Sequence, residues 1–88
     1  MNSSQHRAGD RVTDVHFTED AMSVDLADGR TITVPLVMYP TLLHASPDQR
    51  AGWEICGAGY GLHWPELDED LSVEGLLRGT PSRAEGHA

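Results

Sequence analysis

Four carboxylates within five residues form the densest group of side chains that could do chemistry. They are Glu66, Asp68, Glu69 and Asp70. Such a run can be a solvated segment before a helix N-terminus, where the helix dipole favours negative charge. It can also be a patch that meets the cations of a protein partner, or a set of ligands for a hard cation. The spacing of a calcium-binding loop is absent, so we expect no metal here.

A cysteine and a histidine lie on either side of a glycine-rich stretch. If that stretch is the turn of a hairpin, Cys56 and His63 could face each other, and a thiolate beside an imidazole is the minimum of a nucleophilic dyad. The sequence offers no third group to orient the histidine and no identifiable oxyanion donors. We therefore expect a half-buried cysteine and a histidine at the rim, with no catalytic residues and no enzyme activity.

The remaining histidines and the glycines do not form a recognisable site. No two of those histidines have the spacing of a zinc motif such as His-Glu-x-x-His; they are His6, His16, His44 and His87. Gly57-x-Gly59-x-Gly61 lacks the spacing of a dinucleotide loop, and a strand-like segment follows it in place of a helix. The glycines are typical of a turn between strands. No cofactor is expected.

Two tryptophans flank the same glycine-rich stretch, at positions 53 and 64. A hairpin would bring them together, so burial in the core is one interpretation. An exposed interface anchor is the other, because tryptophan is enriched in binding hot spots. Together with the neighbouring polar residues they give the set expected to contact a partner: Trp53, His63, Trp64, Glu66, Asp68, Glu69 and Asp70.

The charge balance restricts the partners further. Six arginines, no lysine and fourteen acidic residues give a net charge of −8, which repels phosphate backbones and anionic membranes. We expect no direct nucleic-acid binding, no membrane contact and no Schiff-base lysine chemistry; a basic protein partner fits better. Cys56 is the only cysteine and no apolar run approaches the roughly 20 residues of a membrane span, so we expect a cytoplasmic protein.

At 88 residues the chain has room for one domain. Residues 1–10 and 80–88 are polar and lack periodicity, which predicts disordered tails around a folded segment over residues 11–79. A core of that size is only marginally sufficient for stability, which favours a homodimer or a standing partner.

Alternating apolar residues predict a three-stranded meander in the first half of the chain. Its strands are expected at Val12 to Phe17, Met22 to Leu26 and Ile32 to Val34, and Pro35 ends the third because it cannot donate a ladder hydrogen bond. Asp28-Gly29 is typical of a tight primed turn between the second and third strands.

Helical signals are short and local. A helix is expected to begin near Pro40, and Ser46-Pro47-Asp48-Gln49 has the form of a capping box that begins a second helical turn. Leu71 to Arg78 reads as a closing helix, with Ser72 as its best N-cap candidate.

The segments Trp53 to Gly57 and Leu62 to Trp64 predict a second hairpin. The expected fold is therefore α+β: a small, mostly antiparallel sheet, built from the meander and the second hairpin, with short helices on one face.

These residues resemble a bacterial family, Domain of Unknown Function 2442, over roughly residues 11–79. The motifs that carry the resemblance are Asp28-Gly29-Arg30, Pro35-Leu36, Tyr39-Pro40, Leu42-Leu43, Ala45, Gln49-Arg50, Trp53 and His63-Trp64-Pro65-x-Leu67-Asp68-Glu69-Asp70-Leu71-Ser72-Val73. The resemblance implies an α+β fold similar to the N-terminal domain of a small nitrifier protein, in which a helix-turn-helix follows. It also implies frequent encoding beside another small uncharacterised family, numbered 4160, in an arrangement suggestive of toxin and antitoxin pairs. It assigns no catalytic residue.

The leading hypothesis is a non-enzymatic interaction module, the acidic antitoxin-like half of such a pair, which binds a basic partner encoded by the adjacent gene. Two alternatives stay open. One is a regulator-associated domain that acts on DNA only through a partner chain, and the other is a small ligand-sensing domain.

Overall fold

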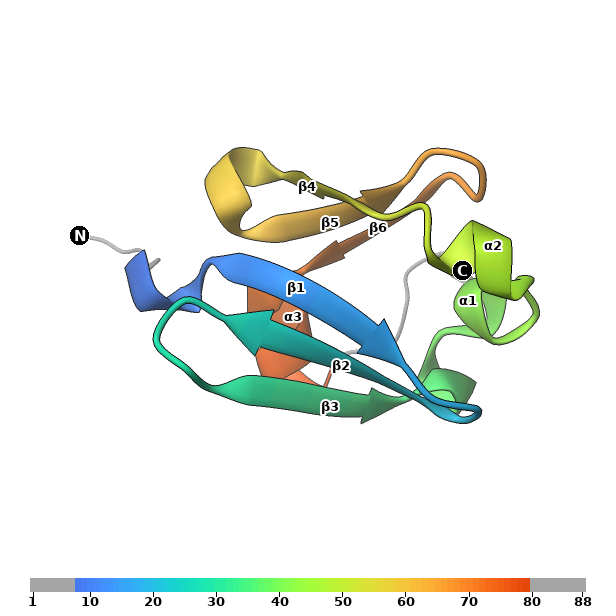
Figure 1. Ribbon diagram of the computed structural model, residues 1–88, viewed down its shortest axis with the longest axis horizontal. Helices are drawn as coiled ribbons and strands as arrows, with labels where there is room; N and C mark the ends of the chain where they lie inside the picture. Colours follow the sequence, from blue (N-terminus) through green and yellow to red (C-terminus); the bar gives the residue numbers. More distant parts are fainter. Residues whose placement is uncertain (1–7, 80–88) are drawn as a thin grey trace.

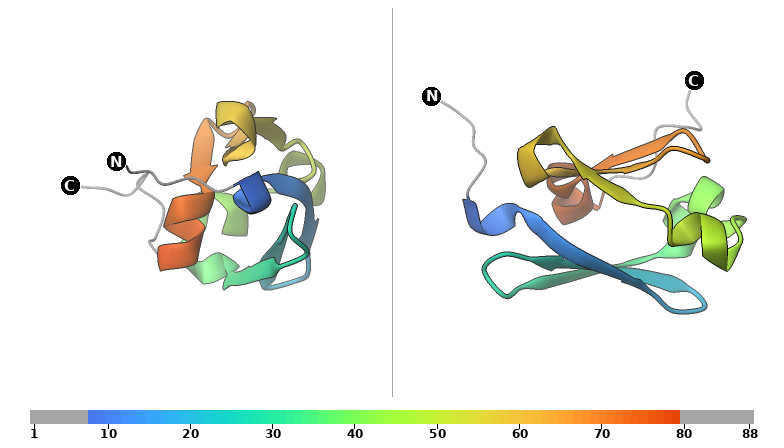
Figure 2. Two further views of the ribbon diagram at one scale, coloured as in Figure 1. Left: turned by 90° about the vertical axis from the view of Figure 1, so that its left-hand side faces the viewer. Right: turned by 45° about the horizontal axis from the view of Figure 1, so that its top comes forward.

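The computed structural model describes residues 8–79, which form two three-stranded antiparallel sheets with short helices beside them (Figure 1). The first sheet has the order β1-β2-β3 and the second the order β4-β5-β6. The two sheets lie one above the other, and the buried apolar side chains of both belong to one core (Figure 2). The α+β class expected from the sequence is confirmed. The meander and the second hairpin do not share one sheet as expected, because the hairpin gains a third strand and forms a second sheet.

In the first sheet, buried and more exposed side chains alternate along the strands, and one β-bulge interrupts the alternation in β1. Strands β1 (Val12–Phe17), β2 (Ala21–Leu26) and β3 (Thr31–Pro35) follow the predicted meander. Val12 pairs with Leu26 and Asp14 with Asp25, so β1 carries one extra residue at this bulge. Val12 and Val15 are therefore both buried although they are three residues apart.

The turn between β2 and β3 differs from the expected primed turn. Within residues 8–79, Ala58 and Asp68 are the non-glycine residues with positive φ, so Asp28 does not adopt the left-handed conformation that such a turn requires at both central positions. Gly29 alone takes positive φ here, and the Leu26 amide donates to the Arg30 carbonyl to close a three-residue loop. The Asp28 carboxylate instead accepts hydrogen bonds from the Arg30 amide and guanidinium.

Two single-turn helices, α1 (Pro40–Leu43) and α2 (Pro47–Arg50), connect the sheets at one end of the molecule (Figure 1). The predicted capping box is present, because Ser46 Oγ accepts from the Gln49 amide while the Gln49 side chain accepts from the Ser46 amide. Arg50 donates to the carbonyls of Leu42 and Leu43 and so satisfies the C-terminal end of α1.

The second sheet contains a strand that periodicity did not indicate. Strands β4 (Glu54–Cys56) and β5 (Gly61–Trp64) form the expected hairpin, and β6 (Glu69–Ser72) pairs with β5 as a third strand. The predicted closing helix is therefore shorter than expected, since α3 spans Val73–Arg78. Ser72 caps it, as predicted, by accepting from the Gly75 amide.

Helix α3 contacts both β6 and β3, so it covers one side of the space between the sheets (Figure 2). The hairpin loop between β4 and β5 also contributes to the packing, because a Cβ on Gly59 would lie 2.9 Å from the Arg11 side chain. In the part of the chain that is described, no helix has the length and hydrophobicity needed to cross a bilayer.

The prediction of a loose segment over residues 1–10 is wrong for residues 8–10. Ala8–Asp10 form a 3-10 turn whose Gly9 carbonyl accepts from the Asp28 amide, and Asp10 pairs with Arg30. The rest of both predicted tails, residues 1–7 and 80–88, lies outside the described residues.

Candidate functional site

The outer face of the second sheet carries a row of polar side chains across its three strands. The register pairs His63 of β5 with Glu54 of β4 on one side and with Asp70 of β6 on the other. His63 Nδ1 donates to Asp70 Oδ1 over 2.5 Å, and the Asp70 side chain is 72% exposed. His63 and Asp70, both expected to contact a partner, are therefore neighbours on an accessible face.

Trp64 and Glu69, two other residues expected to contact a partner, are not accessible. They pair across β5 and β6 on the inner face, where Trp64 has no exposed surface and Glu69 is 2% exposed. The indole Nε1–H of Trp64 donates to the Arg50 carbonyl over 3.0 Å. The prediction that Trp64 and Glu69 contact a partner is wrong, because both side chains are buried inside the protein.

The turn between β5 and β6 presents the remaining carboxylates. Glu66 and Asp68 are exposed, and Asp68 adopts φ of 53°, a left-handed conformation that aspartate tolerates better than most residues. Trp53 is half-buried and packs against the core. We call the exposed set Glu54, Glu66, Asp68 and Asp70 the acidic surface.

The electrostatics of the acidic surface are set by the lack of nearby cations. Residues 51–77 contain neither arginine nor lysine. Among the described residues, no arginine forms an ion pair with Glu54, Glu66 or Asp68. By contrast, Asp10 and Asp28 near the first sheet both pair with Arg30.

The register does not produce the cysteine–histidine dyad. Cys56 lies opposite Gly61, and His63 lies opposite Glu54, so the two side chains are offset along the hairpin. Asp70 forms a hydrogen bond with the imidazole of His63. Cys56, which was expected to be half-buried, is exposed on the edge strand β4. The suggestion that Cys56 and His63 face each other is wrong.

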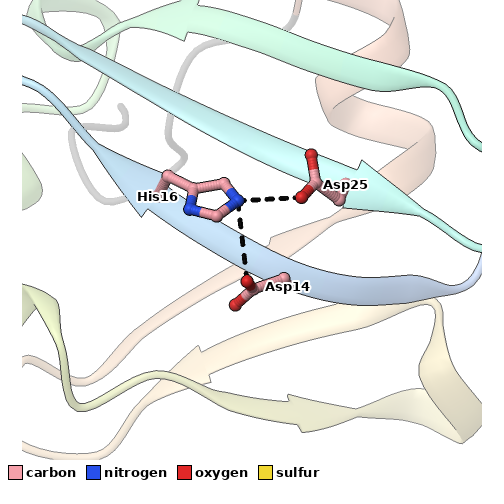
Figure 3. A group of neighbouring side chains, drawn as sticks. All are labelled: Asp14, His16 and Asp25. Atoms are coloured by element: carbon pink, nitrogen blue, oxygen red, sulfur yellow. Dashed lines mark hydrogen bonds and ion pairs between the residues drawn. The ribbon is translucent and has the colours of Figure 1, made fainter.

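A second group of polar side chains lies on the outer face of the first sheet, where Asp14 and His16 of β1 approach Asp25 of β2 (Figure 3). His16 Nε2 lies 2.8 Å from Asp25 Oδ2 and 3.5 Å from Asp14 Oδ2. Thr31 of β3 donates to the other oxygen of Asp25 over 2.9 Å. We call Asp14, His16 and Asp25 the outer triad.

The hydrogen bond to Asp25 raises the pKa of His16 above 6.5, and the charge of Asp14 adds to this. The same bond, with a further one from Thr31, lowers the pKa of Asp25 below 3.8. The sequence offers no second histidine as a partner for His16, and the structure supplies two aspartates in its place. The signal available in the sequence is Asp14-x-His16, two residues on one face of one strand, but the third member comes from the pairing of β1 with β2, in which Asp14 lies opposite Asp25.

Two similar solved structures belong to proteins whose function is not established. A crystal structure of a protein of unknown function from Rhodospirillum rubrum is 39% identical, with a TM-score of 0.71, and the alignment covers 82% of this chain and 89% of that one. A solution NMR structure of an uncharacterised protein from Chromobacterium violaceum is 28% identical, with a TM-score of 0.70 over 89% of this chain and 70% of that one. None of the curated proteins matches significantly.

The model of one protein family matches residues 12–82, which include every strand of both sheets and all of α3. The resemblance seen in the sequence motifs is thereby confirmed. The chain belongs to the family described as Protein of unknown function (DUF2442).

Proposed function

We propose that this protein is a non-enzymatic interaction module that binds a basic protein partner through the acidic surface. In the fuller form of the proposal it is the antitoxin-like member of a cytoplasmic pair, and its partner is encoded by the adjacent gene. The observation that carries the proposal is the exposure of Glu54, Glu66 and Asp68. They lie in residues 51–77, which contain no arginine or lysine, and no arginine of the described residues pairs with them.

A surface with charges of one sign affects the rate at which a partner associates as well as the affinity of the complex. Carboxylates that have no cation nearby leave a negative potential that attracts a basic surface and repels an acidic one. The net charge of −8 reinforces this local field. Each exposed pair formed with a partner contributes only about 0.2–1 kcal/mol, so several must act together.

Strand β4 also exposes apolar surface at the edge of the second sheet, on the opposite face from Glu54, because Ile55 pairs with the buried Leu62. Ile55 is 45% exposed on β4, an edge strand on which all three residues are exposed. Trp53 precedes that strand and is half-buried. Exposed apolar surface on an edge strand supplies contact area that charged pairs alone do not provide.

Binding to the purified product of the adjacent gene tests the proposal. We expect association that weakens steeply between 50 and 300 mM salt, roughly the range over which exposed charges become screened. The triple variant Glu66→Gln, Asp68→Asn, Asp70→Asn should bind about tenfold more weakly, which corresponds to roughly 1.4 kcal/mol spread over three pairs. Asparagine at position 68 keeps a residue that tolerates left-handed φ.

A matched control neutralises three carboxylates elsewhere: Glu19→Gln, Asp20→Asn, Asp48→Asn, all exposed positions. This control should bind within twofold of the natural chain. If both triple variants bound the partner equally weakly, the net charge of the protein would determine binding, and the acidic surface would not be the binding site. No association at 50 mM salt would contradict the pairing itself.

The antitoxin-like role has its own test. Expression of the neighbouring protein alone should slow bacterial growth, and co-expression with this chain should restore it. Restoration that is unchanged by the triple variant, or a neighbour that does not affect growth, would argue against this role.

A further inference from the structure

We propose that the outer triad is a binding site for a divalent transition-metal ion, with zinc as its best occupant. Nothing in the proposed partner binding requires this site, which lies on the first sheet and away from the acidic surface. The three side chains bring one imidazole nitrogen and two carboxylate oxygens together, with all three ligand atoms within 4.8 Å of one another.

The distances suit a small metal ion. Zinc lies about 2.0–2.2 Å from nitrogen and oxygen ligands, so two ligand atoms of a tetrahedral site lie roughly 3.3–3.5 Å apart. His16 Nε2 and Asp14 Oδ2 are 3.5 Å apart, which fits without movement. His16 Nε2 and Asp25 Oδ2, at 2.8 Å, must separate by about half an ångström as the ion replaces the proton that they share.

The backbone holds the triad in place before any ion arrives. Strand alternation places Asp14 and His16 on the same face of β1, and Asp14 lies directly opposite Asp25 in the register. Thr31 donates to Asp25 Oδ1, which leaves Oδ2 directed at His16. A hydrogen bond of this kind to the distal oxygen of a ligand orients it for the metal.

The opposed carboxylates give a physical reason for a cation at this place. Like charges directly across an antiparallel pair are destabilising. Asp14 and Asp25 have this relation, and among residues 8–79 the basic side chain that pairs with both is His16 rather than an arginine. A divalent ion between them would remove the repulsion and add bonds to both.

The mixed donor set selects the kind of ion. Magnesium and calcium prefer six or more oxygen ligands, whereas an imidazole nitrogen suits zinc, copper or nickel. Three protein ligands on an exposed face leave at least one position for water. The site is therefore of the open kind rather than the closed four-ligand kind of structural zinc sites.

Titration of the full chain with zinc chloride, followed by NMR, tests the proposal. We expect the largest shifts at residues 13–16, 25 and 31, and none with magnesium chloride at the same concentration. His16→Gln and Asp25→Asn should each weaken zinc binding at least tenfold, measured by competition with a chromophoric chelator. Thr31→Val should weaken it by about tenfold through the loss of orientation alone.

His63→Gln is the matched control, because His63 is also a strand histidine hydrogen-bonded to an aspartate but belongs to no group of three possible ligands within residues 8–79. It should bind zinc within twofold of the natural chain. Unchanged affinity in His16→Gln, an exposed position whose replacement leaves the core intact, would overturn the proposal. So would shifts centred on His63, His6 or His87.

Discussion

Arg50 connects the two sheets, because its carbonyl contacts the second sheet and its guanidinium contacts the first. The Arg50 carbonyl accepts from the Trp64 indole of the second sheet, while the Arg50 guanidinium caps α1 and lies 5.9 Å from the ring centre of Phe17 in the first. These contacts explain two of the family motifs, Gln49-Arg50 and His63-Trp64, through folding. The exposed members of the second motif, such as Asp68 and Asp70, remain available for binding.

Replacing Trp64 with phenylalanine should lower the free energy of unfolding by about 2–3 kcal/mol. The change removes the indole hydrogen bond and leaves the Arg50 carbonyl without its donor. It also leaves a small cavity in the core, because the larger Trp64 side chain is completely buried. Urea denaturation followed by circular dichroism measures the loss. Trp53→Phe, at a half-buried position, should cost less than half as much. Equal losses would show that the indole hydrogen bond contributes little.

At the scale of elements, the features that depend on neighbours in the chain could be predicted and those that depend on distant pairing could not. The capping box at Ser46 and the β2–β3 hairpin are local patterns, and both are present. Strand β6 begins with Glu69 and Asp70, which do not favour strands; pairing with β5 and burial of Glu69 beside Trp64 make it one. The outer triad was missed for the same reason, since it depends on the pairing of Asp14 with Asp25 across β1 and β2, which alternation within each strand does not specify.

The helices are so short that their caps matter more than their propensities. Helix α2 has four residues and buries none of them, so it depends on its capping box. Ser46→Ala should lower the free energy of unfolding by about 1 kcal/mol. Ser46→Asn should restore most of it, because asparagine is an equally good N-cap. Chemical denaturation of the three proteins compares them, and an asparagine variant no better than alanine would contradict the capping role.

At the scale of the whole molecule, the core between the sheets includes a tyrosine whose ionisation is opposed. Tyr39 is 1% exposed, and its pKa is raised above 10.0 by burial and by the negative charge of Glu69 from the second sheet. Tyr39 belongs to the same buried cluster as Leu62 and Trp64, so the segment after the first sheet and the second sheet share one interior.

This tyrosine makes the fold sensitive to alkali. In the unfolded chain Tyr39 releases its proton near pH 10, whereas the folded protein retains the proton to higher pH. Folded protein then binds more protons than unfolded, so stability should be intact below pH 10 and fall as the pH rises through the folded-state pKa. Unfolding curves at pH 8, 9, 10 and 11 measure this. Tyr39→Phe should flatten the alkaline part of the profile. A profile unchanged by Tyr39→Phe would assign the alkaline loss to other groups.

The strand order described above also bears on how fast the chain reaches its structure. Every strand of both sheets pairs with the strand next to it in the chain, and no crossover connects distant segments within a sheet. Short separations of this kind keep the entropy of closing each loop small, and low contact order is accompanied by rapid folding. We therefore expect each meander to assemble as its own kinetic unit, with docking of the two around Trp64 as the last and slowest event.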